Sequence, residues 1–333
     1  QTGGGCRASN YLYLLRKALA RAGLDYVPVV SLNLSGMEKN PGFKLTLPIL
    51  RKAVFAVIYG DLMMNVGWQV RPYEVTRGDT DRCLQQCRAY LLGEMRQGKG
   101  MTYKSMVKHF DYIIDQFKAV PVQGAQKVRV GVVGEIYVKY APLGNNDLAN
   151  FLLSEGVEPV IPGLMDFIIF KVYNRDVDVD LYGGHIAKKK LCRFLEKYLM
   201  KYQHALIDAL KRSDRFRAPG DFNDLHSMIH GYLGDGNKMG EGWLLTAEML
   251  ELIHSGVPNI VCTQPFGCLP NHIVGKGMIR RIKEDYPDSN IVAIDYDPGA
   301  TRINQENRIK LMLANAQKKR MMEEKKQQTA AEN

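Results

Sequence analysis

The carboxyl-terminal half of the chain alternates short apolar runs with amphipathic stretches. Residues 128–138 (VRVGVVGEIYV) are apolar and rich in valine, which predicts a strand. A Gly/Asn loop, an amphipathic segment over 147–155 and a second apolar run over 157–161 follow. This order of strand, helix and strand predicts two parallel strands joined by a right-handed crossover.

A second unit of the same kind lies further along the chain. The pattern predicts a helix over 242–254, a strand over 257–262, a helix over 271–286, a strand over 290–295 and a closing helix over 299–316. We expect the middle strand to end at Cys262, where a loop with two prolines and a second cysteine, Cys268, begins. Because alternating strands and helices favour an open sheet, we predict four mostly parallel strands in a doubly wound domain.

The amino-terminal part is richer in helical patterns. It contains an amphipathic helix over 8–22, an apolar strand over 26–32, an apolar helix over 48–66, a polar helical stretch over 71–118 and a linker with Pro and Gly over 119–127. We therefore predict an α/β fold with two Rossmann-like or flavodoxin-like parallel-sheet domains and helical insertions. Residues 1–124 form the first, incomplete domain with its helical segment, residues 125–316 form the second domain, and residues 317–333 form a charged tail.

The first domain is expected to be incomplete because of how the chain begins. Gly3, Gly4, Gly5 and Cys6 precede a helix, as in the second half of a strand–loop–helix unit, and the strand expected before them is missing. The first residue is Gln1 and not Met. We expect the chain to be a piece of a longer protein.

Composition narrows the class of protein. Hydrophobic residues make up 46% and charged residues 24%, as in soluble globular proteins. There is no apolar run long enough for a transmembrane helix and no signal-peptide pattern, so we expect a cytoplasmic protein with no membrane partner. The net charge of +10 has two interpretations: it favours binding of an anionic partner, or it only keeps a basic surface soluble. No aromatic and basic RNA-binding signature is present, so nucleic acid is not expected as a partner.

Cysteines are the strongest chemical signal in the sequence. The motifs of dinucleotide, P-loop, nucleophile-elbow and zinc-protease sites are absent. Cys6, Cys262 and Cys268 lie in predicted loops before helices, where exposed N–H groups lower a thiol pKa and favour the thiolate that binds iron. Gly4 and Gly5 would let the backbone donate N–H groups to cluster sulfides. Packing residues remain the alternative for Cys262 and Cys268.

Other paired residues have weaker metal signals. Cys83 and Cys87, four positions apart, share a helix face, but two core thiols are favoured over a metal pair. Cys192 lies in an amphipathic stretch and is expected in the core. His226 and His230 have the same spacing, and histidines satisfied by hydrogen bonds or by solvent are favoured there.

Three motifs carry a resemblance to a known family. TGGGCRASNY, RVGVVGEIYV and the run NIVCTQPFGCLPNHIVGKGM resemble the carboxyl-terminal part of large activase-related proteins of the 2-hydroxyacyl-CoA dehydratase family, over residues 1–315. In that family an ATP-binding activase module is fused to a dehydratase-like region that carries a 4Fe–4S cluster on three cysteines. The resemblance implies Cys6 and Cys262 as cluster ligands, Cys268 as an extra ligand or neighbour, and a further ligand outside this chain.

The resemblance also implies a function. ATP-driven electron injection reduces the cluster, which then reduces an acyl-CoA thioester by one electron so that water can leave. This region is therefore expected to be the iron–sulfur module of such a dehydratase-like (lyase) or reductase system. The activase module is the expected partner, and the substrate is expected to be of the acyl-CoA type. The resemblance is also compatible with a homodimer. As an isolated chain it is expected to be inactive, and no ATPase activity is assigned to it.

Two catalytic candidates and two competing functions remain open. Glu135, at the end of a predicted strand, and His272, beside the cysteine loop, are either polar neighbours of the cluster or structural residues held by hydrogen bonds. The alternative function is a non-catalytic docking or regulatory domain that binds the activase or a partner subunit. A thiol enzyme that uses Cys262 or Cys268 as its nucleophile is the third hypothesis.

Overall fold

The computed structural model describes residues 10–31, 44 and 46–331. The chain divides into two compact units, residues 1–54 and 55–333. The predicted boundary between residues 124 and 125 falls inside the second unit, and it stays a prediction.

The first unit contains one complete helix among its described residues, α1 (Tyr11–Arg21). This helix confirms the described part of the prediction for residues 8–22. Gly23 follows the end of this helix, and its φ of +69° is the left-handed conformation that favours glycine.

The strand predicted over 26–32 is wrong for its described part. Residues 26–31 form turns and irregular backbone, and Tyr26, Val27 and Val30 are exposed. The described residues of the first unit hold no sheet that this apolar run could join. An apolar run forms a buried strand only where neighbouring strands pair with its backbone and other elements cover its side chains.

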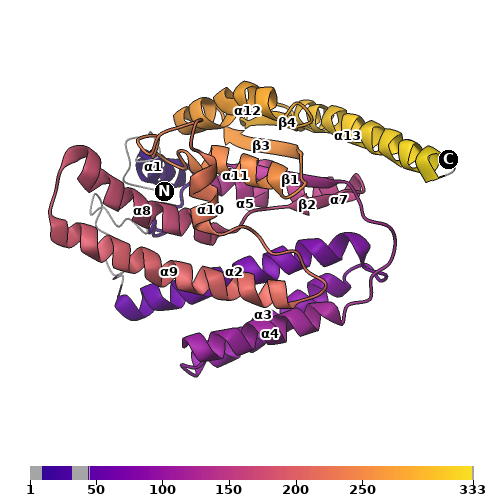
Figure 1. The fold of residues 1–333 in the computed structure, drawn as a ribbon. Coiled ribbons are helices and arrows are strands. Elements are labelled where there is room, and N and C mark those ends of the chain that lie inside the picture. Colours follow the sequence, from indigo (N-terminus) through magenta and orange to yellow (C-terminus); the bar gives the residue numbers. More distant parts are fainter. Residues whose placement is uncertain (1–9, 32–43, 45, 332–333) are drawn as a thin grey trace. The chain divides into compact units, whose positions relative to one another are not determined.

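The second unit is built on one parallel sheet, and this confirms an α/β fold with four parallel strands (Figure 1). The strands are β1 (Arg129–Gly134), β2 (Glu158–Val160), β3 (Asn259–Pro265) and β4 (Asn290–Tyr296). Their order is β2-β1-β3-β4, and each neighbouring pair is parallel.

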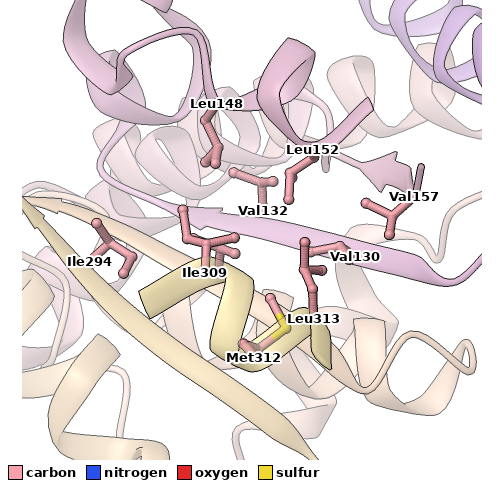
Figure 2. Close-up of a cluster of buried hydrophobic side chains, with 10 residues drawn as sticks. Val130, Val132, Leu148, Leu152, Val157, Ile294, Ile309, Met312 and Leu313 are labelled. Atoms are coloured by element: carbon pink, nitrogen blue, oxygen red, sulfur yellow. The ribbon is translucent and has the colours of Figure 1, made fainter. Parts of the chain in front are cut away.

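Apolar side chains leave the sheet on both faces, which explains why β1 reads as a continuous apolar run. On one face Val132 of β1 packs with Leu152 and Ile309 from two covering helices (Figure 2). On the other face, Val133 packs with Leu250 and Ile282. Adjacent residues of one strand therefore serve opposite cores, as the alternation of side chains along a strand requires.

Helices precede, separate and follow the strands. They are α2 (Leu47–Val70, which begins in the first unit), η2 (Arg71–Tyr73), α3 (Asp79–Arg96), α4 (Tyr103–Lys118), α5 (Ile136–Tyr140), α6 (Pro142–Asn145), α7 (Leu148–Ser154), α8 (Leu164–Tyr182), α9 (Ile186–Arg212), α10 (Phe222–Met228), α11 (Leu244–His254), η3 (Asn271–Gly275, a π-helical turn), η4 (Lys276–Met278), α12 (Ile279–Asp285) and α13 (Arg302–Ala331). Helices α7 and α13 cover one face of the sheet, and α11 and α12 cover the other.

The long helices form a layer of their own beside the sheet. α8 packs against α9, α9 against α4, and α4 against α3 (Figure 1). None of the described helices is long and apolar enough to cross a bilayer.

Several element boundaries differ from the predicted ones. β1 ends at Gly134 instead of 138, since Glu135 begins a helical turn, and the predicted helix over 271–286 is divided into η3, η4 and α12. α13 continues through the described part of the predicted charged tail. β3 runs to Pro265 and so places Cys262 inside the strand.

Candidate functional site

The strand order identifies one edge of the sheet as the candidate site. β1 connects through α5–α7 to β2 on one side, whereas β3 pairs with the other side of β1. The carboxyl ends of β1 and β3, at Gly134 and Pro265, therefore border the point where the winding direction of the chain reverses. Ligands of open α/β sheets bind beyond the strands at such a switch point.

Glu135 is fixed at this edge by a close backbone approach. Gly134 has a φ of +143°, and a Cβ atom there would lie 1.8 Å from the carbonyl oxygen of Thr263. The next amide, Glu135 N, donates to that same oxygen at 3.0 Å. The Glu135 carboxylate accepts a hydrogen bond from Val138 N at 2.9 Å and caps α5.

Four side chains make up the switch-point cluster, namely Glu135, Glu241, Cys268 and Asn271. Asn271 Nδ2 donates to Cys268 Sγ at 3.2 Å and lies 3.4 Å from Glu241 Oε2. Glu241 Oε1 accepts a hydrogen bond from Ile136 N at 3.2 Å, which ties this loop to α5. Asn271 is fully buried, and its Oδ1 has no hydrogen-bond partner among the described residues.

Sequence reasoning missed Glu241 and Asn271. Gly240 and Gly242, with φ of +60° and +50°, flank Glu241 and allow the sharp turn that aims its carboxylate inward. A carboxylate between two glycines in a polar loop was the available signal. Asn271 was predicted only as the first residue of a helix.

The pKa of the Cys268 thiol is raised, which disfavours the thiolate form. Partial burial raises its pKa, and the carboxylates of Glu241 and Glu135 add to this increase, whereas the hydrogen bonds from Asn271 oppose it. The lowered pKa that we expected for a thiol before a helix is therefore wrong here. Two nearby carboxylates and the loss of hydration outweigh the N–H groups.

Cys262 lies in the core and not in a loop. It pairs in register between Val133 and Ala293 and is fully buried in the apolar cluster under α11 and α12. A Cβ atom at Gly275 would lie 3.4 Å from its Sγ, so the η3 backbone covers the sulfur directly. Burial raises the pKa of this thiol to about 12, so the expected thiolate is also wrong for Cys262.

His272 lies toward the neighbouring strand end. Its Nε2 is 3.5 Å from Asp295 Oδ1 at the end of β4. Lys276 Nζ lies 3.8 Å from the other oxygen of Asp295, and Gln264 Nε2 donates to Oδ1 at 2.6 Å. His272 is thus part of a second polar group beside the switch-point cluster.

The predicted site residues therefore separate into three groups. Glu135 and Cys268 come together in the switch-point cluster, and His272 faces β4. Cys262 lies in the core behind them. Gly4, Gly5 and Cys6 lie outside the described residues.

The weaker metal candidates have structural surroundings. Cys83 and Cys87 are buried on α3, as expected for core thiols. His226 Nε2 is 2.7 Å from Asp235 Oδ1 and 3.1 Å from the Tyr173 hydroxyl. This confirms the interpretation of His226 as a satisfied histidine.

A buried ion pair joins two helices behind the site. Lys139 Nζ of α5 lies 2.7 Å from Glu248 Oε1 of α11, and both side chains are almost fully buried. The pair connects the helix capped by Glu135 with the helix that covers the core around Cys262.

The described donors do not form a complete cluster site. In the part of the chain that the structure describes, no three His, Cys, Asp or Glu side chains are arranged to hold a metal ion. A 4Fe–4S cluster needs several thiolates. Two of the three predicted ligands are described. Cys262 is buried, whereas Cys268 is partly accessible and lies at the sheet edge.

Comparison of the chain with models of known families, with curated proteins and with solved structures found no match.

Proposed function

We propose that this chain is the iron–sulfur module of an ATP-dependent electron-transfer system similar to the 2-hydroxyacyl-CoA dehydratases. The observation that carries the proposal is the position of Cys268. Its thiol lies at the switch point of a parallel sheet, where α/β proteins bind ligands, and a buried amide donates to its sulfur. The motifs around Cys6 and Cys262 supply the resemblance to that family.

The proposal assigns different roles to the three cysteines. Cys268 and Cys6 are ligands, with a further ligand outside this chain, and Gly4 and Gly5 donate N–H groups near Cys6. Cys262 is the third candidate, and its buried position makes it the ligand that needs the largest rearrangement. When bound, the cluster would supply one-electron transfer to an acyl-CoA-type substrate.

The residues around Cys268 would then act on the sulfur. Asn271 donates a hydrogen bond that stabilises the thiolate, whereas burial, and then the carboxylates of Glu241 and Glu135, favour the protonated thiol in the free protein. Because a ligand must lose its proton to bind iron, cluster binding at this edge should weaken as the pH falls.

The proposal extends to the rest of the molecule. The activase module, fused or separate, is the partner. The compartment is cytoplasmic, and the chain alone is inactive.

Iron and sulfide analysis after anaerobic reconstitution tests the proposal. We expect the wild-type chain, extended at its amino end, to bind iron and sulfide and to absorb visible light. Cys268→Ala and Cys6→Ala should each lower the iron content by half or more, and Cys262→Ala is measured alongside them. Cys192→Ala, which alters a buried thiol on α9, is the matched control and should keep full iron content. A colourless, iron-free extended protein would rule the proposal out.

A second candidate function is docking of a partner at the same edge. Phe266, Leu269 and Ile273 are more than half exposed in the segment that carries Cys268. Such a cluster of apolar side chains is typical of a surface that another protein covers. A docking or regulatory domain would lack iron altogether, so the same measurement separates the two functions.

A further inference from the structure

The outer strand of the sheet leaves one side of its backbone open. β4 lies at the end of the order β2-β1-β3-β4, so β3 is its partner and no further described strand lies beyond it. The N–H of Asn290 and the C=O of Tyr296 both bond to the β3 side. Because peptide groups alternate in direction along a strand, those of Ile291, Ala293 and Asp295 point away from β3.

The open side of β4 is limited to residues 291–293. Asp295 O accepts a hydrogen bond from Gln305 Nε2 of α13 at 3.0 Å, which closes the end of the strand. The outward N–H and C=O groups of Ile291 and Ala293 have no hydrogen-bond partner in the part of the chain that the structure describes. An unpaired backbone of this kind is a template for a further strand.

A shallow groove of about 640 Å³ gives access to this open backbone. Its apolar floor consists of Ile291, Val292 and Ala293 of β4 together with Ile279 of α12. α12 and α13 cover opposite faces of the sheet beside β4. The groove therefore opens between these two helices, on the side of β4 that faces away from β3.

Cations surround the groove. They are Lys276 of η4, Arg280 and Lys283 of α12, and Arg308 of α13. Glu284, the acid among the lining residues, pairs with Arg280. Lys283 and Arg308 are exposed and form no ion pair with a described residue. The groove thus keeps a positive charge that an acidic partner would neutralise.

The charge and the open backbone together select one kind of occupant. A second copy of this chain would bring the same set of cations to the groove and would be repelled. Nucleic acid or an anionic lipid would match the charge, but neither offers the alternating N–H and C=O groups that pair with a strand. An acidic peptide segment satisfies both requirements.

We infer that this groove binds an extended, acidic segment of a partner protein, which adds a strand beside β4. The backbone of that segment would pair with residues 291–293. Since side chains alternate along a strand, acids at every second position would face Lys276 and Lys283 on the α12 side. No member of the switch-point cluster lines the groove, so the inference goes beyond the proposed iron–sulfur function and does not depend on it.

Fluorescence anisotropy of a labelled peptide of alternating glutamate and valine tests the inference on the 333-residue chain. We expect saturable binding with a Kd below about 100 μM. Binding should weaken at high salt, because salt screens exposed charges. A peptide of alternating lysine and valine is the control of opposite charge and should not bind.

N-methylated peptides test the backbone pairing on the wild-type chain. Methylation of all valines, or of all glutamates, removes the N–H donors from one side of the added strand and keeps its charge. The set that faces β4 should weaken binding by about tenfold or more when it is methylated, because several hydrogen bonds are lost.

Charge reversals test the position of the site. Lys283→Glu and Arg308→Glu should each weaken binding by about tenfold, because attraction becomes repulsion. Lys104→Glu, which alters an exposed lysine on α4 outside the groove, is the matched control and should leave binding unchanged. Thermal unfolding confirms that each variant is folded before it is titrated.

Several results would overturn the inference. Equal binding of the acidic and basic peptides would mean an unspecific apolar contact. Binding that neither methylated set weakens would mean that charge alone holds the peptide. Binding that survives both charge reversals would place the site elsewhere, and no saturable binding by the wild-type chain would remove it. Self-association in sedimentation that the acidic peptide disrupts would assign the groove to a second copy.

Discussion

Gly134 controls the geometry of the switch-point cluster at the scale of a single residue. Its lack of a side chain lets the end of β1 lie against the Thr263 carbonyl, and this contact sets the position of Glu135 and α5. The raised pKa values of Cys262 and Cys268 also belong to this scale. Both thiols are protonated near neutral pH, which weakens the hypothesis of a cysteine nucleophile.

Gly134→Ala should destabilise the second unit strongly. The added methyl group would overlap the Thr263 carbonyl, and the residue would keep a φ of +143° that side chains rarely adopt. We expect a loss of about 3–5 kcal/mol in the free energy of unfolding, measured by urea denaturation. Gly60→Ala is the control, since a Cβ atom there meets no heavy atom within 4 Å and α2 should gain up to about 1 kcal/mol. Equal stability of the two variants would contradict the contact.

Asp61→Asn should change how stability depends on pH. The pKa of Asp61 in the folded chain is about 6, above its ordinary value of 3.8, so the folded state holds its proton more tightly. The free energy of unfolding should therefore fall as the pH rises from about 4 to 6, by about 2–3 kcal/mol from this group. Asn keeps one oxygen for the amides of Leu164 and Met165. Urea denaturation at several pH values should show a flatter profile for Asp61→Asn than for wild type or for Asp208→Asn, which alters an exposed acid on α9.

At the scale of elements, the ends of strands depend on contacts that the pattern of apolar residues does not show. Thr263 and Gln264 are polar, so the sequence predicts that the strand stops at Cys262. Both are fully buried in β3, where Thr263 Oγ1 donates to Val133 O and Gln264 Nε2 donates to Asp295 Oδ1. The Thr263 hydroxyl and the Gln264 amide nitrogen have partners inside the sheet, whereas Gln264 Oε1 has none among the described residues. Buried polar residues of this kind look like loop residues in the sequence.

The ion pair between α5 and α11 gives a test at the same scale. Lys139→Met would leave Glu248 buried without its counter-charge, and we expect a loss of about 3–5 kcal/mol in the free energy of unfolding. The double variant with Glu248→Leu should recover most of that loss, since apolar side chains tolerate the site. Arg280→Ala, which removes an exposed partner of Glu284, should cost less than about 1 kcal/mol. A double variant as unstable as the single one would show that the pair is needed for more than charge balance.

At the scale of the whole molecule, the class of fold was predictable and part of the candidate site was not. The strands around Val130, Val157 and Ile291 are β-branched runs separated by helical patterns, and such alternation predicts a parallel sheet. The switch-point cluster brings together Glu135 and Cys268 with Glu241, which comes from a distant loop. The sequence pattern contains no information about such a long-range approach.

The order of the strands also affects how the molecule folds. Thr263 and Val133 bond to each other across 130 positions, because α8–α11 are inserted between β2 and β3. During synthesis the β1–β2 pair can form early, but the other edge of β1 stays unpaired until β3 has emerged. Distant parallel pairings of this kind form slowly, and an open apolar strand edge can pair with other chains in the meantime. The second unit is therefore expected to be most prone to aggregation in the interval between the synthesis of α8 and that of β3.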